Sequence, residues 1–207
     1  MPSGLVGVWA FALIRPMHKG RLEAFSDGVL AIIITIMVLE MKVPHGTNLA
    51  DLLPVLPVFL SYALSFVYVG IYWNNHHHLF QAAKHVNGAV LWANLHLLFW
   101  LSLFPFVTGW LGENHLTTST VALYGGVLIM AGTAYYILVR TLLAGHGPDS
   151  TLAKAIGSDF KGKISLVIYA AGILLACWLP WGSLALYTAV AIMWLVPDRR
   201  IEKKLAE

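Results

Sequence analysis

Three polar residues open the first long apolar stretch of the chain: Arg21, Ser26 and Asp27. A charged group at the edge of a membrane helix is costly and marks either a functional site or a paired structural site. Asp27 lies in the first turn and a half, where a carboxylate is favoured by the positive end of the helix dipole. On spacing alone, a helix cap with Arg21 extended toward the membrane surface remains an alternative.

The same stretch carries a second pattern. Gly28, Ile32, Thr35 and Leu39 are spaced four, three and four residues apart, which places them on one face of a helix. Ile32 is eleven residues after Arg21, about 16 Å along a helix and so close to the middle of a bilayer. Spacing alone does not separate a pore face from a packed face, because an intramembrane threonine commonly bonds to its own helix.

The histidine run at residues 76–78 suggests a metal site, but its geometry argues against one. Successive helical residues point about 100° apart, so three in a row cannot all face one ion. A diheme site would need facing histidines, and His96 has no mid-depth partner in another span. We therefore expect no metal and no cofactor.

An intramembrane enzyme would need a nucleophile and a base at a common depth. Ser26, Asp27 and His77 are the residues available for that role. Asp27 beside Arg21 is expected to be a stably ionised carboxylate rather than a tuned base. We expect that the protein is not an enzyme.

Composition places these residues in a membrane protein. Of 207 residues, 58% are hydrophobic and only 11% are charged, less than half of the roughly 25% typical of soluble domains. This excludes a soluble domain, a disordered chain and a nucleic-acid-binding protein. The single cysteine, Cys177, cannot form an intrachain disulfide.

Hydropathy predicts an all-α integral membrane protein with six transmembrane helices. The uncharged run 164–196 would be about 50 Å long as one helix, too long for one crossing. Pro180, Trp181 and Gly182 interrupt it and favour two short spans. The expected spans are 24–43, 52–75, 86–111, 117–139, 164–179 and 183–196, with a solvated loop at 144–163.

Charge placement sets the expected orientation. With six spans, twelve of the thirteen Lys and Arg residues fall on one side and only Lys42 on the other. The positive-inside rule then predicts a multi-pass protein of the cell membrane with both termini in the cytoplasm. We expect residues 1–16 to be an N-terminal extension, either a mis-assigned start with Met17 as the native first residue or a segment lying on the membrane surface, and 17–207 to form one membrane domain.

Two motifs resemble one known family. The pattern Arg21-x-x-x-Phe25-Ser26-Asp27 and the apolar residues after it resemble the first helix of the lysosomal potassium channel family called transmembrane protein 175, in its bacterial six-helix form. The run from Trp73 to Phe80 is similar to a second signature of that family. The six-span layout extends the resemblance over most of the chain.

The resemblance implies a homotetramer whose pore is lined by the first helix of each subunit. It assigns Ile32 and Leu39 to apolar rings of the pore, Ile32 being the constriction, and Thr35 to a ring linked to cation selectivity. Bacterial relatives often have leucine at the constriction. A polar network that fixes the pore helix against its neighbours is implied for Arg21, Phe25, Ser26, Asp27, Trp73 and His77.

These expectations agree with membrane physics. The chain contains no Thr-Val-Gly-Tyr-Gly loop, so a carbonyl cage of that type is not expected to strip the ion. An isoleucine ring would gate by dewetting, and the threonines would partly replace hydration. We predict modest selectivity for potassium over sodium, with monovalent cations as the permeant species. The alternative is a secondary transporter or proton-coupled cation carrier, although no internal repeat relates 24–111 to 117–196.

Overall fold

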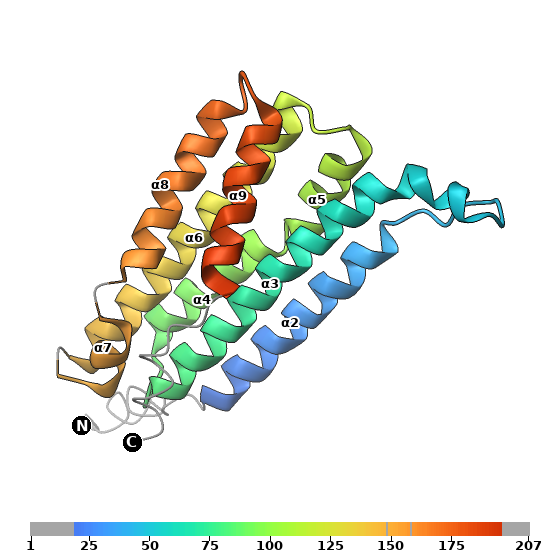
Figure 1. Cartoon of the computed structure of the whole chain (residues 1–207). Helices are drawn as coiled ribbons and strands as arrows, with labels where there is room; N and C mark the ends of the chain where they lie inside the picture. Colours follow the sequence, from blue (N-terminus) through green and yellow to red (C-terminus); the bar gives the residue numbers. More distant parts are fainter. Residues whose placement is uncertain (1–18, 148, 158, 196–207) are drawn as a thin grey trace, which may run out of the picture.

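The computed structural model describes residues 19–147, 149–157 and 159–195, and every regular element in these ranges is helical (Figure 1). The predicted extension 1–16 and the end of the predicted span 183–196 lie outside the described residues. In chain order the elements are α2 (Lys19–Leu39), η1 (Leu49–Val55), α3 (Leu56–Ala82), α4 (Gly88–Leu101), α5 (Phe104–Glu113), α6 (Thr118–His146), α7 (Thr151–Ile156), α8 (Phe160–Leu175) and α9 (Pro180–Leu195).

The predicted all-α fold is confirmed, and each of the six expected spans corresponds to helix. Four segments are long and apolar enough to cross a bilayer: Lys19–Leu39, Leu49–Ala82, Gly88–Glu113 and Thr118–His146. The last two expected spans are α8 and α9, with 16 residues each. A connection at 176–179 separates them and Pro180 begins α9, as the Pro-Trp-Gly interruption predicts.

Helix ends differ from the hydropathy limits. The first helix begins at Lys19 and ends at Leu39, so the expected span 24–43 started too late and ended too late. The second continues to Ala82, seven residues beyond the predicted end, so the histidine run lies within a helix. The predicted loop 144–163 contains the end of α6 and the short helix α7. Hydropathy cannot detect these extensions, because polar residues at a membrane surface continue a helix without apolar character.

The third span is divided into α4 and α5 by the turn at Ser102 and Leu103. Pro105 lies in the first turn of α5 and has no backbone N–H to donate to the carbonyl of Leu101. The Ser102 hydroxyl donates instead to the carbonyl of Phe99 at 2.7 Å, so the break is stabilised locally.

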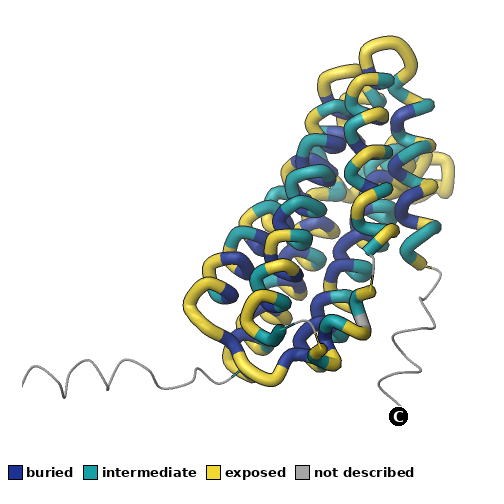
Figure 2. The backbone as a smooth tube through the Cα atoms, turned by 90° about the vertical axis from the view of Figure 1, so that its left-hand side faces the viewer, coloured by how far each residue is buried: buried dark blue, intermediate teal, exposed yellow. Residues whose placement is uncertain are grey.

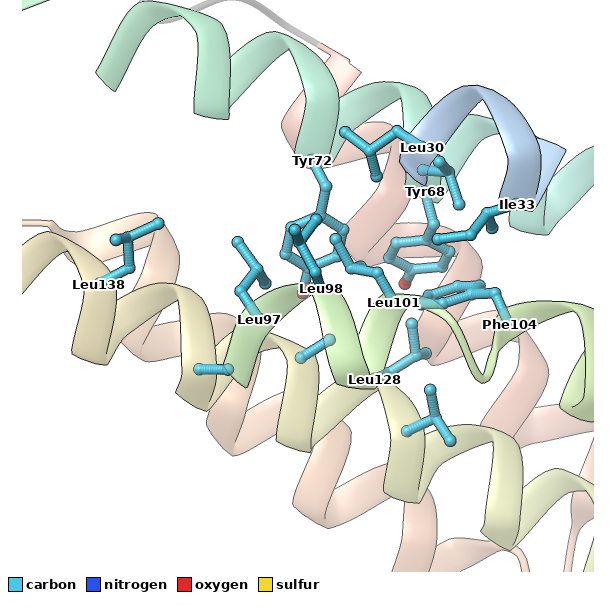
Figure 3. Close-up of a cluster of buried hydrophobic side chains, with 14 of the residues drawn as sticks. Leu30, Ile33, Tyr68, Tyr72, Leu97, Leu98, Leu101, Phe104, Leu128 and Leu138 are labelled. Carbon is cyan, nitrogen blue, oxygen red and sulfur yellow. The ribbon is translucent and has the colours of Figure 1, made fainter. Parts of the chain in front are cut away.

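The helices pack around α6, which makes its most extensive contacts with α4 and α8. Large side chains fill the interior, including Tyr68, Phe104 and Leu128, which come from three different helices (Figure 3). Buried positions lie along the inner faces of the bundle and exposed positions lie on its periphery (Figure 2). α2 lies at one edge, where it contacts α3, α4 and α5 (Figure 1).

Tyr187 of α9 fills space that two glycines leave open. An ideal Cβ built at Gly125 of α6 would overlap the Tyr187 hydroxyl, and one built at Gly172 of α8 would overlap its ring. The Tyr187 side chain is fully buried, and its hydroxyl donates to the carbonyl of Val121 at 3.5 Å. Small residues therefore let these three helices approach closely.

We expect Gly125→Ala to destabilise the fold by about 1–3 kcal/mol, because the added methyl must displace the buried Tyr187 ring. The matched control is Gly126→Ala, whose Cβ would meet no described atom within 4 Å. Thermal unfolding of the purified protein in detergent measures both. Equal melting temperatures for the two variants would contradict the packing assignment.

Candidate functional site

The helix α2 has two faces with different surroundings. Its buried side chains are spaced four, four, three and four residues apart: Leu22, Ser26, Leu30, Ile33 and Met37. They pack toward α3, α4 and α5. Because the spacing matches one helical face, most of the opposite face of α2, including Ile32, Thr35 and Leu39, is not covered by the described residues.

The predicted pore residues lie on this unpartnered face. The side chains of Ile32 and Leu39 are 57% and 79% exposed, and Thr35 and Gly28 are exposed as well. The Thr35 hydroxyl donates to the carbonyl of Ile32 at 2.9 Å. None of the three predicted pore side chains is buried against its own chain. Their roles in a pore need further copies of the chain and stay predictions.

A chain of hydrogen bonds holds the buried face near its start. The carbonyl of Leu22 accepts from the Ser26 hydroxyl at 2.9 Å, and the Ser26 oxygen accepts from Nδ2 of Asn94 at 2.9 Å. Nε2 of His76 lies 2.8 Å from Oδ1 of Asn94, and an amide oxygen only accepts. His76 therefore donates, and the bonds run in one direction from α3 through α4 to α2.

The three side chains that make these hydrogen bonds are all buried, with exposed fractions of 0% for Ser26 and 2% for Asn94 and His76. A polar group buried without a partner costs about 1–3 kcal/mol, so each of these residues makes the other two tolerable. Hydrogen bonds between side chains of different helices also fix how those helices sit relative to each other.

A second contact lies at the surface beside this chain. Nε1 of Trp73 donates to Oδ1 of Asp27 at 3.1 Å. The ring of His77 stacks on Trp73 with 6.2 Å between centroids and 21° between planes. Trp73 therefore contacts the motif carboxylate directly, whereas His77 contacts Trp73 by stacking on its indole.

The histidine that joins the buried network is His76, one position before the predicted one. A helix rotates by about 100° per residue, so His76 points into the bundle and His77 is exposed. Asn94 was missed altogether. Its signal in the sequence is a lone amide in a strongly apolar stretch, because such groups in membrane helices usually bond to a neighbouring helix.

The two other predicted network residues are not joined to it within this chain. Phe25 is 56% exposed, and Arg21 is exposed with no hydrogen bond or ion pair to the described residues. The cation that ties down the start of α2 is Lys19, whose Nζ donates to the carbonyls of Phe80 at 2.5 Å and Ala83 at 3.2 Å. These carbonyls end α3, where the helix dipole favours a positive charge.

At the other end of α2, Nζ of Lys42 pairs with Oε1 of Glu113 at 2.7 Å. The hydrogen bond to Glu113 is the main cause of a raised pKa of Lys42, and the Glu113 charge adds to it. Both side chains are largely exposed, so the pair adds little stability.

The other histidines have separate surroundings. Within the described ranges, no three His, Cys, Asp or Glu residues gather as a metal site would require. Nε2 of His96 accepts from Nε1 of Trp100 in the same helix at 3.0 Å. The Ser26 hydroxyl donates to a backbone carbonyl, so Ser26, Asp27 and His77 do not form a nucleophile–base set.

Comparison with known proteins identifies one family. The family model described as "Endosomal/lysosomal potassium channel TMEM175" matches residues 21–105. A curated relative, "Potassium channel HX13_20290" from Chryseobacterium sp. (strain P1-3), is 58% identical over 191 residues and covers 92% of this chain and 100% of its own. The chain belongs to the TMEM175 family. The family match at 21–105 contains the residues of the buried hydrogen bonds and of the Trp73–Asp27 contact, whereas Lys19 and Glu113 lie outside it.

Two further relatives show how far the TMEM175 likeness extends. The human "Endosomal/lysosomal proton channel TMEM175" is 41% identical over 97 residues, which cover 41% of this chain and 19% of the human protein. The crystal structure of "a lysosomal potassium-selective channel TMEM175 homolog" from Chamaesiphon minutus superposes with a TM-score of 0.73. It is 27% identical and covers 86% of this chain and 96% of its own.

We expect Asn94→Leu to lower stability by about 2–5 kcal/mol, because Ser26 and His76 both lose a buried partner. Asn114→Ala is the control, since Nδ2 of exposed Asn114 bonds only to the carbonyl of Trp110 in its own helix. Thermal unfolding in detergent measures the loss. A melting temperature of Asn94→Leu equal to that of Asn114→Ala would show that the buried chain does not hold α2.

Proposed function

We propose that this protein is a potassium-permeable channel in which α2 helices from several copies line one pore. Three observations support it. The chain is membrane-spanning in character. It belongs to a family whose relatives in Chryseobacterium, Streptomyces collinus and Chamaesiphon minutus are named potassium channels. Above all, α2 presents Ile32, Thr35 and Leu39 on a face that residues 19–147, 149–157 and 159–195 leave exposed.

One chain supplies one such face, so an enclosed conduit needs several copies around an axis. Closed cyclic symmetry is the usual arrangement of identical subunits. We propose a homotetramer in a lipid bilayer, as the family resemblance implies. Exposed Arg21, Phe25 and the Trp73–His77 pair at the start of the stripe are then available to a neighbouring subunit.

The side chains of the stripe determine how ions would pass. A ring of Ile32 side chains repels water and forms the barrier, and Leu39 adds a second apolar ring. The Thr35 hydroxyl has donated its hydrogen to the Ile32 carbonyl. Its oxygen lone pairs therefore remain available to a cation beside the barrier. With no charge in these rings, selectivity for potassium over sodium is modest.

The buried face of α2 supplies the rigidity this mechanism needs. The bonds from His76 through Asn94 to Ser26, the Trp73–Asp27 contact and the Lys19 cap all act on its first three turns. We propose that they set the direction of α2, so that the side chains further along it meet at one axis. We propose that this end of α2 faces the cytoplasm, which is the side that the positive-inside rule favours for the basic residues.

The deciding experiment is flux from liposomes that contain the purified protein and a potassium gradient. A channel dissipates the gradient without saturation and without a coupled ion. The break between α4 and α5 is a feature also found in transporters, whose discontinuous helices bind substrate. Saturable flux coupled to a second ion would favour the transporter, and no flux would contradict both.

We expect Ile32→Asn to raise potassium conductance and weaken selectivity among cations, because a polar ring removes the dewetting barrier. Val38→Asn is the matched control. Val38 is 42% exposed on the same helix but points about 120° away from Ile32. Single-channel currents in planar bilayers measure both variants. Equal changes in the two variants would show that Ile32 is not the constriction.

We expect Thr35→Ala to lower the preference for potassium over sodium, because the variant lacks the hydroxyl oxygen beside the barrier. Assembly should be unaffected, since the Thr35 side chain bonds only to its own helix. The reversal potential under bi-ionic conditions measures the preference. A wild-type reversal potential would remove Thr35 from the selectivity mechanism.

A further inference from the structure

A short turn joins α3 to α4, and side chains of two other helices, α2 and α6, make hydrogen bonds with it. From α2, Lys19 donates to the carbonyl of Ala83. From the end of α6, the ring of His146 lies against the next residues: its Nε2 is 2.9 Å from the backbone nitrogen of Lys84 and 3.4 Å from that of His85. The turn at residues 83–85 therefore connects the last turn of α6 with the start of α2.

The partners of His146 determine where its proton lies. The backbone N–H of Lys84 only donates, so Nε2 of His146 must accept and carries no hydrogen. Its Nδ1 lies 2.8 Å from the carbonyl of Leu142, which only accepts, so Nδ1 carries the hydrogen. The ring holds the turn only as a neutral imidazole. A second proton, at Nε2, would point an N–H donor of the ring at the backbone N–H donor of Lys84, so the hydrogen bond between them would be lost.

His85 acts on the same ring. Its imidazole stacks on that of His146 with 4.2 Å between centroids and 15° between planes, and its Nε2 donates to the carbonyl of Gly145 at 3.1 Å. His85 can gain a proton at Nδ1 without losing this bond. The ring of His85 therefore covers one face of the His146 ring beside the turn.

Among the described residues, the other ionisable groups near this end are Lys84 on the turn, Arg140 on α6 and Asp149 after it, Lys154 on α7, and Asp159, Lys161 and Lys163 at the start of α8, together with Lys19 and Glu23, whose Nζ and Oε1 atoms lie 3.9 Å apart on α2. Lysine and arginine keep their charge between pH 5 and 8, and aspartate and glutamate are ordinarily ionised there. Imidazole is the side chain whose charge normally changes in this range. Acidification therefore acts at this turn through the two histidines.

We propose that His146 is a proton-sensitive positioning residue, whose neutral ring anchors the turn at 83–85 and whose protonation releases the turn and the start of α2. The anchoring step is independent of conduction. Its effect on ion flow rests on the proposed function and follows from the Lys19 contact. Release loosens α2 at the end where its direction is set, so flux falls when this face is acidified.

Amide hydrogen exchange of the reconstituted protein at pH 7.5 and 5.5, corrected for intrinsic exchange rates, tests the anchor directly. We expect the protection of the Lys84 amide to fall about fivefold at pH 5.5, the factor that one ordinary hydrogen bond represents. In His146→Gln the amide oxygen can still accept from Lys84 but gains no charge, so protection should be retained at both pH values. In His85→Gln, which removes the stacked ring but leaves Nε2 of His146 beside Lys84, the fall should still occur.

The control is His45→Gln, which removes an exposed histidine at the opposite end of α2 and should keep the wild-type pH response. Unchanged protection of Lys84 in the wild type, or the same fall in His146→Gln, would overturn the proposal. Potassium flux in the same liposomes should fall at acidic pH in the wild type and in His45→Gln but not in His146→Gln. Absence of flux at all pH values would contradict the channel and leave the exchange result to decide the anchor.

Discussion

A membrane interior offers no water to a polar group, and this constraint governs how α2 is held. The buried face of α2 is apolar except for Ser26, whose oxygen accepts from Asn94, which in turn accepts from His76. Burying any one of these polar side chains without a partner would cost free energy, but together they satisfy each other's hydrogen bonds. Because the three belong to three helices, the bonds fix where α2 sits and leave its opposite face uncovered. The same interaction that stabilises α2 thus fixes which of its faces the described residues leave exposed.

The rest of the bundle supports this arrangement from behind. α6 lies at the centre of the packing, and Tyr187 of α9 occupies the space left by Gly125 and Gly172. α2 contacts only the near helices α3, α4 and α5 in a substantial way. The fold therefore has two parts. The other helices pack closely together, and the peripheral helix α2 is held against them at its start by hydrogen bonds. Those bonds, together with the turn at 83–85, are where small changes in hydrogen bonding act on α2.

Much of this could be predicted from local patterns. Hydropathy and the Pro180 interruption predict the six helical segments, and the spacing of Ile32, Thr35 and Leu39 predicts a shared face. The motif resemblance also groups Trp73 with Asp27, and Nε1 of Trp73 donates to Oδ1 of Asp27 in the structure. His76 was missed in favour of His77, since one residue changes direction by about 100° and the exact helical rotation is unknown from sequence. Asn94, Lys19 and His146 were missed because each acts on residues more than 60 positions away.

The sequence by itself predicted the membrane class, six apolar spans, an orientation and the family, because each depends on composition, period or a contiguous motif. Only the tertiary structure decided which face of α2 is covered and which histidine joins its anchor. It also decided that the turn at 83–85 is gripped from both α2 and α6. The physical reason is that hydrogen bonds and burial depend on how helices rotate and approach each other in three dimensions. Residues near each other in sequence constrain that rotation only weakly, and packing across the bundle sets it.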